Sequence, residues 1–336
     1  MQEQVAFVTG GSGFIGSEVI RQLNARGVRV RALLRATSPR RNLEGAAFEE
    51  VRGDLGDLEA LKKGVAGADY VFHLAGVIAA PKREIYFKHN AEGSANLARA
   101  CAEANPGLMR FVYVSSLAAS GPSASLSARL ETDAEAPISA YGESKLAGER
   151  EVFSRAEGKF PVTVIRPPAV YGPRDRGLFE FFKIINSGIM PILPARNATC
   201  EKHYSLIHVE DLVQGILQAG LAEGQGAKEV FFLAGDGIHT WTQILREIAG
   251  ALGKKPFRVK VPSFALTGIA GLYTLIGAIT GKQFPLTLDK LSELRPDFWI
   301  CSNEAAKLKI AFRPRYSLAD GIANTVEWYK KNGWLA

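Results

Sequence analysis

Short apolar runs alternate with stretches of helical spacing through the first half of the chain. The runs that predict strands are Val5–Thr9, Val28–Leu34, Phe48–Arg52, Asp69–Leu74, Arg110–Ser115 and Val162–Ile165. Apolar positions three and four residues apart predict helices over Phe14–Arg26, Glu84–Ala104 and Tyr141–Glu157. Apolar strands that alternate with helices form parallel sheets covered on both faces. With right-handed crossovers, this pattern predicts an α/β fold, a Rossmann-type doubly wound parallel sheet.

The pattern changes after Pro167. Five prolines interrupt residues 167–194, with one helix expected near Leu178–Ser187. Tyr204–Val209 and Val230–Leu233 predict two further strands of the sheet, joined by a helix over Glu210–Leu221.

Helical spacing dominates from Gly237 onward. We therefore expect a dinucleotide-binding Rossmann domain from residues 1–168 and 204–236. Residues 169–203 and 237–336 are expected to form a smaller, mostly helical substrate-binding domain. It would cover the carboxyl ends of the strands, where open α/β sheets bind ligands.

Composition is that of a globular protein, with 47% apolar and 22% charged residues in 336. The net charge of +7 suits an anionic cofactor, an acidic membrane surface or nucleic acid. No basic stripe interleaved with aromatic residues appears, so nucleic acid is not an expected partner. Three distant cysteines, Cys101, Cys200 and Cys301, offer no disulfide framework or zinc spacing, and we expect buried thiols, no metal site and a reducing cytoplasm. The residues before Val5 show no basic segment followed by an apolar run and a cleavage site, so we expect no signal peptide.

A glycine-rich turn joins the first strand to the first helix. It reads Thr9-Gly10-Gly11-Ser12-Gly13-Phe14-Ile15-Gly16. Glycines permit the tight turn and let the backbone approach a pyrophosphate, and the helix amino terminus supplies free N–H groups. Because strand, turn and helix occur together, we expect dinucleotide binding at Gly10, Gly13, Phe14, Ile15 and Gly16.

The end of the second strand selects between cofactors. An acid there would bind the 2′-hydroxyl of NAD, but the sequence has Arg35, whose donors can hold a 2′-phosphate. We therefore expect NADP(H) in preference to NAD(H), assisted by Thr37, Ser38 and Arg40. A surface charge is the alternative for Arg35. Asp54, followed by Leu55 after the third strand, is expected near the adenine, with helix capping as its alternative.

Tyr141 and Lys145 form a Y-x-x-x-K at the start of a predicted helix, so they lie on one helical face. Ser116 follows the fifth strand at its carboxyl edge, facing the same crevice. Carbonyl reduction develops negative charge on oxygen and needs a proton. A phenol near an ammonium can supply it, because the cation lowers the phenol pKa. A hydroxyl can hold the oxygen. We expect Ser116, Tyr141 and Lys145 to be catalytic.

The chain resembles the extended short-chain dehydrogenase/reductase family, also called the NAD-dependent epimerase/dehydratase family. The motifs that carry the resemblance are Thr9–Gly16, Gly53–Leu55, His73–Gly76, Asn90–Gly93, Ser115-Ser116, Tyr141–Lys145, Arg166–Pro173 and His208–Asp211. The resemblance implies an enzyme in which Ser116 rather than Ser115 is catalytic. It also implies that Ala75, Gly76, Asn90 and Pro168 line the cofactor. Because family members often dimerise, a homodimer is an expectation by analogy.

Two positions depart from the nucleotide-sugar members of that family. Ala169 stands where they carry an asparagine, and Tyr204 where they carry an arginine, both of which contact the substrate's phosphates. The pattern is more similar to the 3β-hydroxysteroid dehydrogenase and dihydroflavonol reductase branches. This implies an NADP(H)-dependent oxidoreductase that interconverts a ketone and a secondary alcohol on a bulky, largely apolar substrate. The alternatives are a nucleotide-sugar epimerase or dehydratase, and a non-catalytic NADP(H)-binding sensor.

Val261–Gly281 contains no charged residue. Its length fits a membrane span. Three interpretations remain open: a transmembrane helix, a buried helix of the substrate domain, and a helix whose apolar face also contacts a membrane or admits a lipid-like substrate. Under the third interpretation, the protein is cytoplasmic and associated with a membrane. We expect an apolar pocket above Tyr141, lined in part by this segment.

Overall fold

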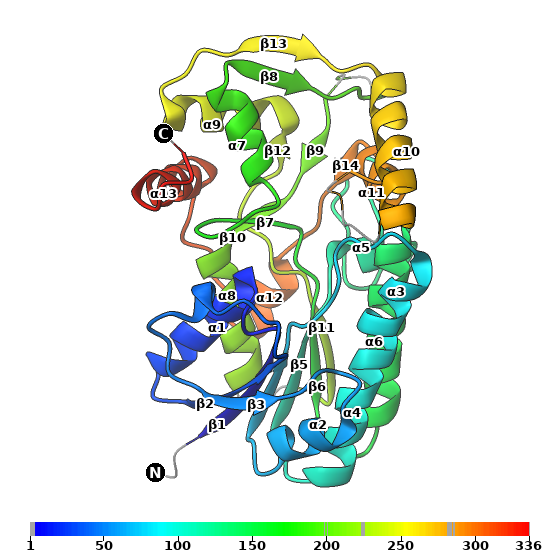
Figure 1. The fold of residues 1–336 in the computed structure, drawn as a ribbon, viewed down its shortest axis with the longest axis vertical. Coiled ribbons are helices and arrows are strands. Elements are labelled where there is room, and N and C mark those ends of the chain that lie inside the picture. Colours follow the sequence, from blue (N-terminus) through cyan, green and yellow to red (C-terminus); the bar gives the residue numbers. More distant parts are fainter. Residues whose placement is uncertain are drawn as a thin grey trace.

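The computed structural model describes residues 4–197, 199, 201–222, 226–280, 284 and 286–335. Its centre is a seven-stranded parallel sheet in the order β11-β6-β5-β4-β1-β2-β3 (Figure 1). The strands are β1 Val5–Thr9, β2 Arg29–Leu34, β3 Glu49–Arg52, β4 Tyr70–His73, β5 Arg110–Val114, β6 Val162–Ile165 and β11 Lys228–Phe231. The reversal of strand order at β1 and β4 is that of a doubly wound sheet, which confirms the expected fold class.

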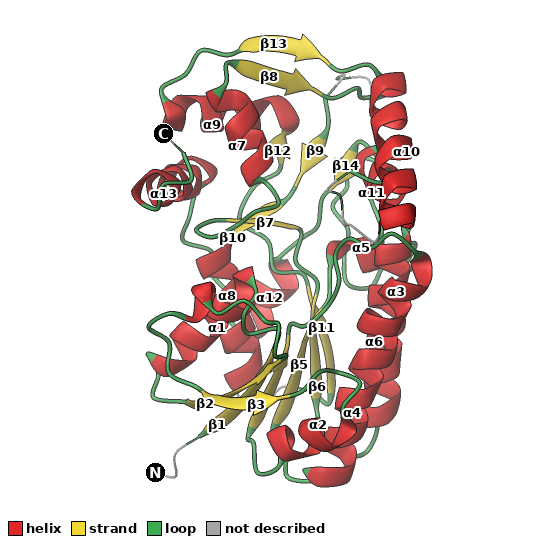
Figure 2. Ribbon diagram, in the orientation of Figure 1, coloured by secondary structure: helices red, strands yellow, loops and turns green. Residues whose placement is uncertain are grey.

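Helices cover both faces of this sheet (Figure 2). One layer contains α1 Phe14–Asn24, α8 Val209–Leu221 and α12 Glu304–Lys309, and the other contains α2 Leu58–Val65, α4 Gly93–Ala104 and α6 Ala140–Ala156. The first core includes Ile20 and Ile216, and the second includes Leu97 and Val152, all fully buried. The expected helix over residues 84–104 consists of α3 Arg83–Phe87, a π-helical turn at Lys88–Glu92, and α4.

A second group of elements lies beyond the carboxyl ends of the strands (Figure 1). Its helices α7 Phe179–Asn186, α9 Trp241–Leu252 and α13 Leu318–Lys331 enclose a separate core. Three small sheets pair β7 Ala169–Tyr171 with β10 Leu206–His208, β8 Ile189–Ile192 with β13 Phe257–Lys260, and β9 His203–Tyr204 with both β12 His239–Thr240 and β14 Phe298–Trp299. The residue limits of the two domains stay a prediction.

The prediction that residues 204–209 form a strand of the main sheet is wrong. Its residues divide between β9 and β10, and neither strand belongs to the seven-stranded sheet. Ser205 lies between them, where its backbone N–H donates to Trp299 O at 2.8 Å. Both strands therefore follow the partners of the small sheets, and β11 alone provides the late strand of the main sheet.

The remaining elements are short apart from α10. They are the 3₁₀ turn Arg41–Leu43, α5 Leu117–Ser120, α10 Ser263–Thr280 and α11 Leu288–Leu294. By length and composition α10 could cross a membrane, but only Ala270 and Gly277 in it are buried. The interpretation of this segment as a buried helix is therefore wrong for residues 263–280. Gly281 and Cys200 lie outside the described residues, whereas Cys101 and Cys301 are free, buried thiols as expected.

Candidate active site

The glycine turn forms a close-packed backbone cradle between β1 and α1. Gly10 has φ of +73°, and the Gly13 N–H donates to Gly10 O at 3.0 Å. A Cβ on Gly10 would lie 2.6 Å from the backbone nitrogen of Ala75, and a Cβ on Gly16 would collide with Gly10 O. Side chains are therefore excluded where the backbone turns into α1. The free N–H groups of the helix start suit a pyrophosphate.

A cavity of ≈ 580 Å³ is lined by this turn and by residues at the carboxyl ends of neighbouring strands. Among the expected cofactor residues, those that line it are Gly10, Gly13, Arg35, Asp54, Leu55, Ala75 and Gly76. The glycine cradle and the basic end at Arg35 fit a phosphorylated dinucleotide. Lining residues that the sequence did not single out include Lys88, His89 and Asn96. Lys88 and His89 lie in the π-helical turn, which no local sequence pattern predicts.

At the end of the cavity beside Arg35, the polar residues that were expected to bind the cofactor make different contacts. Arg35 is exposed, and Ser38 lines the cavity with it while its Oγ accepts from the Arg35 N–H at 3.0 Å. Arg40 instead forms a two-pronged ion pair with Glu50, at 2.8 and 2.9 Å. The helix cap expected as an alternative for Asp54 is made by Asp57, which accepts from the Ala60 N–H at 3.0 Å. Asp54 lines the cavity, and its Oδ1 accepts from the Gly56 N–H at 2.8 Å.

Four residues that were expected at the cofactor do not line this cavity. They are Phe14, Ile15, Gly16 and Asn90. Asn90 is fully buried in the π-helical turn. Its Oδ1 accepts from the Val77 N–H at 2.8 Å, and its Nδ2 donates to Val77 O and to Ser144 Oγ, both at 2.9 Å. Asn90 thus ties the cavity wall to the helix that carries Tyr141.

Helix α6 carries Tyr141 and Lys145, and the β5 end carries Ser116. Lys145 is buried, and its Nζ donates to Val114 O at 2.7 Å. A Cβ on Gly76 would lie 3.8 Å from that Nζ, so the ammonium adjoins the dinucleotide cavity. Ser116 Oγ accepts from the Ala118 N–H at 3.1 Å, whereas the hydroxyl of the buried Ser115 donates to Glu149. Only Ser116 of this pair lines a cavity with Tyr141.

Burial dominates the proton affinities in this group. It raises the pKa of Tyr141 to about 12, with the charge of Glu293 acting in the same direction and a hydrogen bond from Ser116 opposing it. Burial also lowers the pKa of Lys145 to about 7, against the attraction of Glu149. The sequence-based expectation that Lys145 lowers the Tyr141 pKa is therefore wrong for this structure. The phenol is held neutral and can donate a proton.

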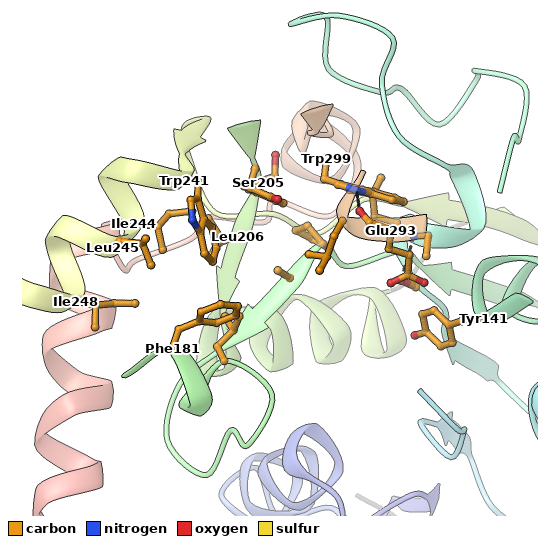
Figure 3. Close-up of a pocket in the computed structure, with 18 residues that line it drawn as sticks. Tyr141, Phe181, Ser205, Leu206, Trp241, Ile244, Leu245, Ile248, Glu293 and Trp299 are labelled. Atoms are coloured by element: carbon orange, nitrogen blue, oxygen red, sulfur yellow. Dashed lines mark hydrogen bonds between the residues drawn. The ribbon is translucent and has the colours of Figure 1, made fainter. Parts of the chain in front are cut away.

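A second cavity, of ≈ 340 Å³, opens beside the Tyr141 hydroxyl (Figure 3). Its far wall consists of Phe181, Trp241, Ile244, Leu245 and Ile248, and most of its lining is apolar. The expectation of an apolar pocket at Tyr141 is thus met. The expectation that residues 261–281 line it is wrong among the described residues, because α9 occupies that wall and α10 lies outside it.

Two expected specificity positions face this second cavity. Ala169 and Tyr204 both line it, as does Pro168, which the resemblance placed beside the cofactor. Its described lining contains no arginine, lysine or histidine, and its only carboxylate is Glu293. The substitutions of Ala169 and Tyr204 therefore coincide with a wall that has no cation for a diphosphate.

Helix α11 joins this cavity to the start of α6. The Asp289 carboxylate accepts from the Ala140 N–H at 2.6 Å, and Glu293 accepts from the Ser139 hydroxyl at 2.7 Å. Negative charge at a helix amino terminus is favourable. The Lys290 ammonium lies 4.3 Å from the centre of the Tyr141 ring. These α11 residues escaped sequence reasoning, since no motif marks them and only the tertiary fold brings them to Tyr141.

A buried ion pair supports the loop that carries Pro168. Arg166 and Glu149 are each buried, and Arg166 Nη2 lies 2.6 Å from Glu149 Oε2. The pair joins the β6 end to the middle of α6. It fixes the loop beside Tyr141 without facing either cavity. Residues that the structure describes contain no group of three metal-ligating side chains.

Known proteins are similar to this chain in sequence and in structure. The sequence model of the NAD dependent epimerase/dehydratase family matches residues 6–234. A relative named ceramide reductase, from Caulobacter vibrioides, is 32% identical over 332 residues, covering 98% of this chain and 96% of that protein. A 4-hydroxy-2-methyl-3-oxo-4-farnesyl-3,4-dihydroquinoline-1-oxide ketoreductase from Stigmatella aurantiaca is 28% identical, covering 75% of this chain and 76% of that protein.

Among solved structures, the crystal structure of gox2253 is similar with a TM-score of 0.80 and 27% identity, covering 99% of this chain and 100% of that one. The extent of these matches agrees with the parallel sheet and its covering helices. They support an NAD(P)-dependent enzyme of the oxidoreductase type. The chain belongs to the NAD-dependent epimerase/dehydratase family.

Proposed function

We propose that this protein is an NADP(H)-dependent oxidoreductase that interconverts a ketone and a secondary alcohol on a bulky, largely apolar substrate. The observation that carries the proposal is the ≈ 340 Å³ cavity at Tyr141, whose walls are aromatic and aliphatic. Apolar side chains bind a substrate through the surface they remove from water. The farnesyl group in the name of the Stigmatella aurantiaca relative is a substrate feature of that kind.

Each of the three catalytic residues has a separate role in carbonyl reduction. A bound nicotinamide cofactor supplies the hydride. Tyr141, neutral because its pKa is about 12, gives its proton to the carbonyl oxygen as negative charge develops there. Ser116, on the same cavity wall, donates a hydrogen bond to that oxygen. Lys145, whose Nζ lies beside Gly76 in the wall of the dinucleotide cavity, would hold the ribose of the cofactor.

Cofactor choice rests on Arg35. Its exposed guanidinium lies at the end of the dinucleotide cavity next to Ser38, where a 2′-phosphate would gain charge-assisted hydrogen bonds. Asp54 also lines this cavity, but Arg35 is the residue at the end of the second strand. This arrangement supports NADP(H) over NAD(H).

The two alternative functions differ from this proposal in what they require of the site. A nucleotide-sugar epimerase or dehydratase needs ligands for a diphosphate, and the described lining of the cavity at Tyr141 holds no cation. A non-catalytic sensor does not need a proton donor beside a substrate cavity. Ser116 and Tyr141 lining one cavity therefore favour the enzyme.

The test is a screen of NADPH oxidation against ketones of graded size and polarity. Each methylene buried in the cavity contributes about 0.8 kcal/mol, so kcat/KM is expected to rise roughly fourfold per added methylene until the cavity is filled. Tyr141→Phe serves as the inactive control. The proposal fails if polar ketones are preferred, or if a nucleotide sugar raises the melting temperature and every apolar ketone is inert.

A further inference from the structure

One face of α10 presents large apolar side chains to solvent. Phe264, Leu272, Leu275 and Ile279 are 80%, 55%, 60% and 76% exposed. At about 100° per residue, these four positions fall within an arc of about 80°. They therefore form a single stripe along the helix.

The opposite face holds α10 to the protein. Its buried residues are the small Ala270 and Gly277, and the helix packs along α11. Adjacent β13 adds two further exposed apolar side chains, Phe257 at 83% and Val259 at 46%. Figure 1 shows β13 at one end of the molecule leading directly into α10 along its flank. We call the exposed apolar residues of β13 and of the α10 stripe the apolar ridge: Phe257, Val259, Phe264, Leu272, Leu275 and Ile279.

The ridge lies in a stretch of the sequence that carries basic residues and no acidic ones. Residues 248–288 contain no aspartate or glutamate, in a chain with 34 acidic residues. The same stretch contains the exposed Lys254, Lys255, Arg258 and Lys260. Arg258 and Lys260 alternate with Phe257 and Val259 along β13, so charge and apolar surface are interleaved.

We propose that the apolar ridge docks this protein on a lipid bilayer that contains anionic lipids, with α10 lying in the headgroup region parallel to the surface. Apolar side chains enter the interface while basic residues attract the anionic headgroups. A second copy of the chain is a poorer occupant. A symmetric contact would bring the same basic residues of both copies together.

The connections of α10 favour lying on the bilayer over crossing it. The helix follows β13, which pairs with β8, and precedes α11, which contacts the start of α6. Both ends therefore belong to one folded body on one side of the membrane. A spanning helix would be surrounded by the hydrocarbon core over about 30 Å, whereas α11 packs along the inner face of α10.

A groove of ≈ 400 Å³ lies beside the start of α10, where Phe264 of the ridge lines it. It is lined by Phe264 and Leu266 and by the exposed Arg196 and Arg295, and it shares Leu294 with the cavity at Tyr141. Because Leu294 lines both, its displacement would give an amphiphile with an anionic or polar head a route from the bilayer to Tyr141. That route rests on the proposed function, whereas the docking surface does not.

The docking surface is tested by cosedimentation of the full chain with vesicles. Phosphatidylcholine vesicles are compared with vesicles that also contain phosphatidylglycerol, at low and high salt. We expect binding to the anionic vesicles that weakens with salt. The paired change Leu272→Gln and Leu275→Gln should reduce it about tenfold or more. Neutralising Lys254, Lys255, Arg258 and Lys260 to glutamine should do the same.

Matched variants control for general effects. Leu308→Gln alters an exposed leucine on α12, and Lys330→Gln with Lys331→Gln removes two charges from α13; neither should change binding. Melting temperature and NADPH binding should stay unchanged in every variant, since all the altered residues are exposed. Equal vesicle binding by the ridge variants and the parent would overturn the proposal. So would resistance of bound protein to alkaline extraction, which indicates a span, or a dimer in solution that the Leu272 and Leu275 changes dissociate.

Discussion

Removing the positive charge of Arg35 tests the proposed cofactor preference. Arg35 lies exposed at the end of the dinucleotide cavity, and its guanidinium makes no hydrogen bond or ion pair with any residue that the structure describes. Arg35→Gln therefore removes no described internal contact. Its effect on binding should come from the ligand.

The expected size of the effect follows from the exposure of Arg35. A hydrogen bond to a charged group contributes about 1.5–3 kcal/mol. Solvent screens an exposed pair, so the lower end applies, at about 1.5 kcal/mol. Arg35→Gln should raise the Kd for NADPH about tenfold and leave the Kd for NADH within about twofold. Arg35→Asp should raise the NADPH Kd further, because a carboxylate repels the 2′-phosphate and can accept from the 2′-hydroxyl of NADH.

Fluorescence titration with NADPH and NADH measures both constants. Arg40→Gln is the matched control, because Arg40 lies close in sequence but is bound to Glu50 at 2.8 Å. It should change neither affinity by much. If the parent protein binds NADH as tightly as NADPH, or if both arginine variants lose NADPH affinity equally, the role given to Arg35 is wrong.

Three further outcomes follow from the site. Tyr141→Phe should retain NADPH binding but lower kcat by about 10²–10⁴, measured with a confirmed substrate; near-normal turnover would remove Tyr141 as proton donor. Since the Tyr141 pKa is raised to about 12, alcohol oxidation, which needs the phenolate, should speed up about tenfold per pH unit below that value, whereas ketone reduction should not; parallel pH profiles of single-turnover rates would contradict this. Arg166→Met should lower the free energy of unfolding by about 3–5 kcal/mol, because it leaves Glu149 buried without its partner; Arg99→Met, which breaks an exposed pair with Glu103, should cost less than about 1 kcal/mol in the same denaturation assay.

The sequence predicted the parts of the fold that local patterns encode. Apolar strands and intervening helices gave the parallel sheet, because each strand must bury both faces. The turn at Gly10 could be recognised because its positive φ and its contact with Ala75 exclude side chains. Tyr141 and Lys145 could be paired because one helical turn separates them.

Long-range placement escaped prediction for equally physical reasons. The two halves of residues 204–209 pair with strands from distant segments, and nothing local specifies those partners. Glu293 lies beside Tyr141 only because α11 packs on the start of α6. The length and apolar composition of α10 are equally compatible with a buried helix and an exposed one, so its exposure required the structure.

The pKa relation between Tyr141 and Lys145 also needed the structure. Spacing brings them to one face, but Lys145 Nζ is directed to Val114 O, and burial acts on both groups. Desolvation disfavours the charged form of each, so it raises the phenol pKa and lowers the ammonium pKa. Sequence cannot supply that degree of burial.

Deuterated NADPH shows whether this protein transfers a hydride to an apolar ketone. The protein is incubated with NADPH that carries deuterium at the transferable position of the nicotinamide and with a bulky apolar ketone, and the product is analysed by mass spectrometry and NMR. We expect one deuterium on the carbinol carbon for each NADPH consumed, and the same transfer about 10²–10⁴ times more slowly with Tyr141→Phe. Deuterium that stays on the cofactor with every apolar ketone, together with conversion of a nucleotide sugar without net cofactor oxidation, would contradict it.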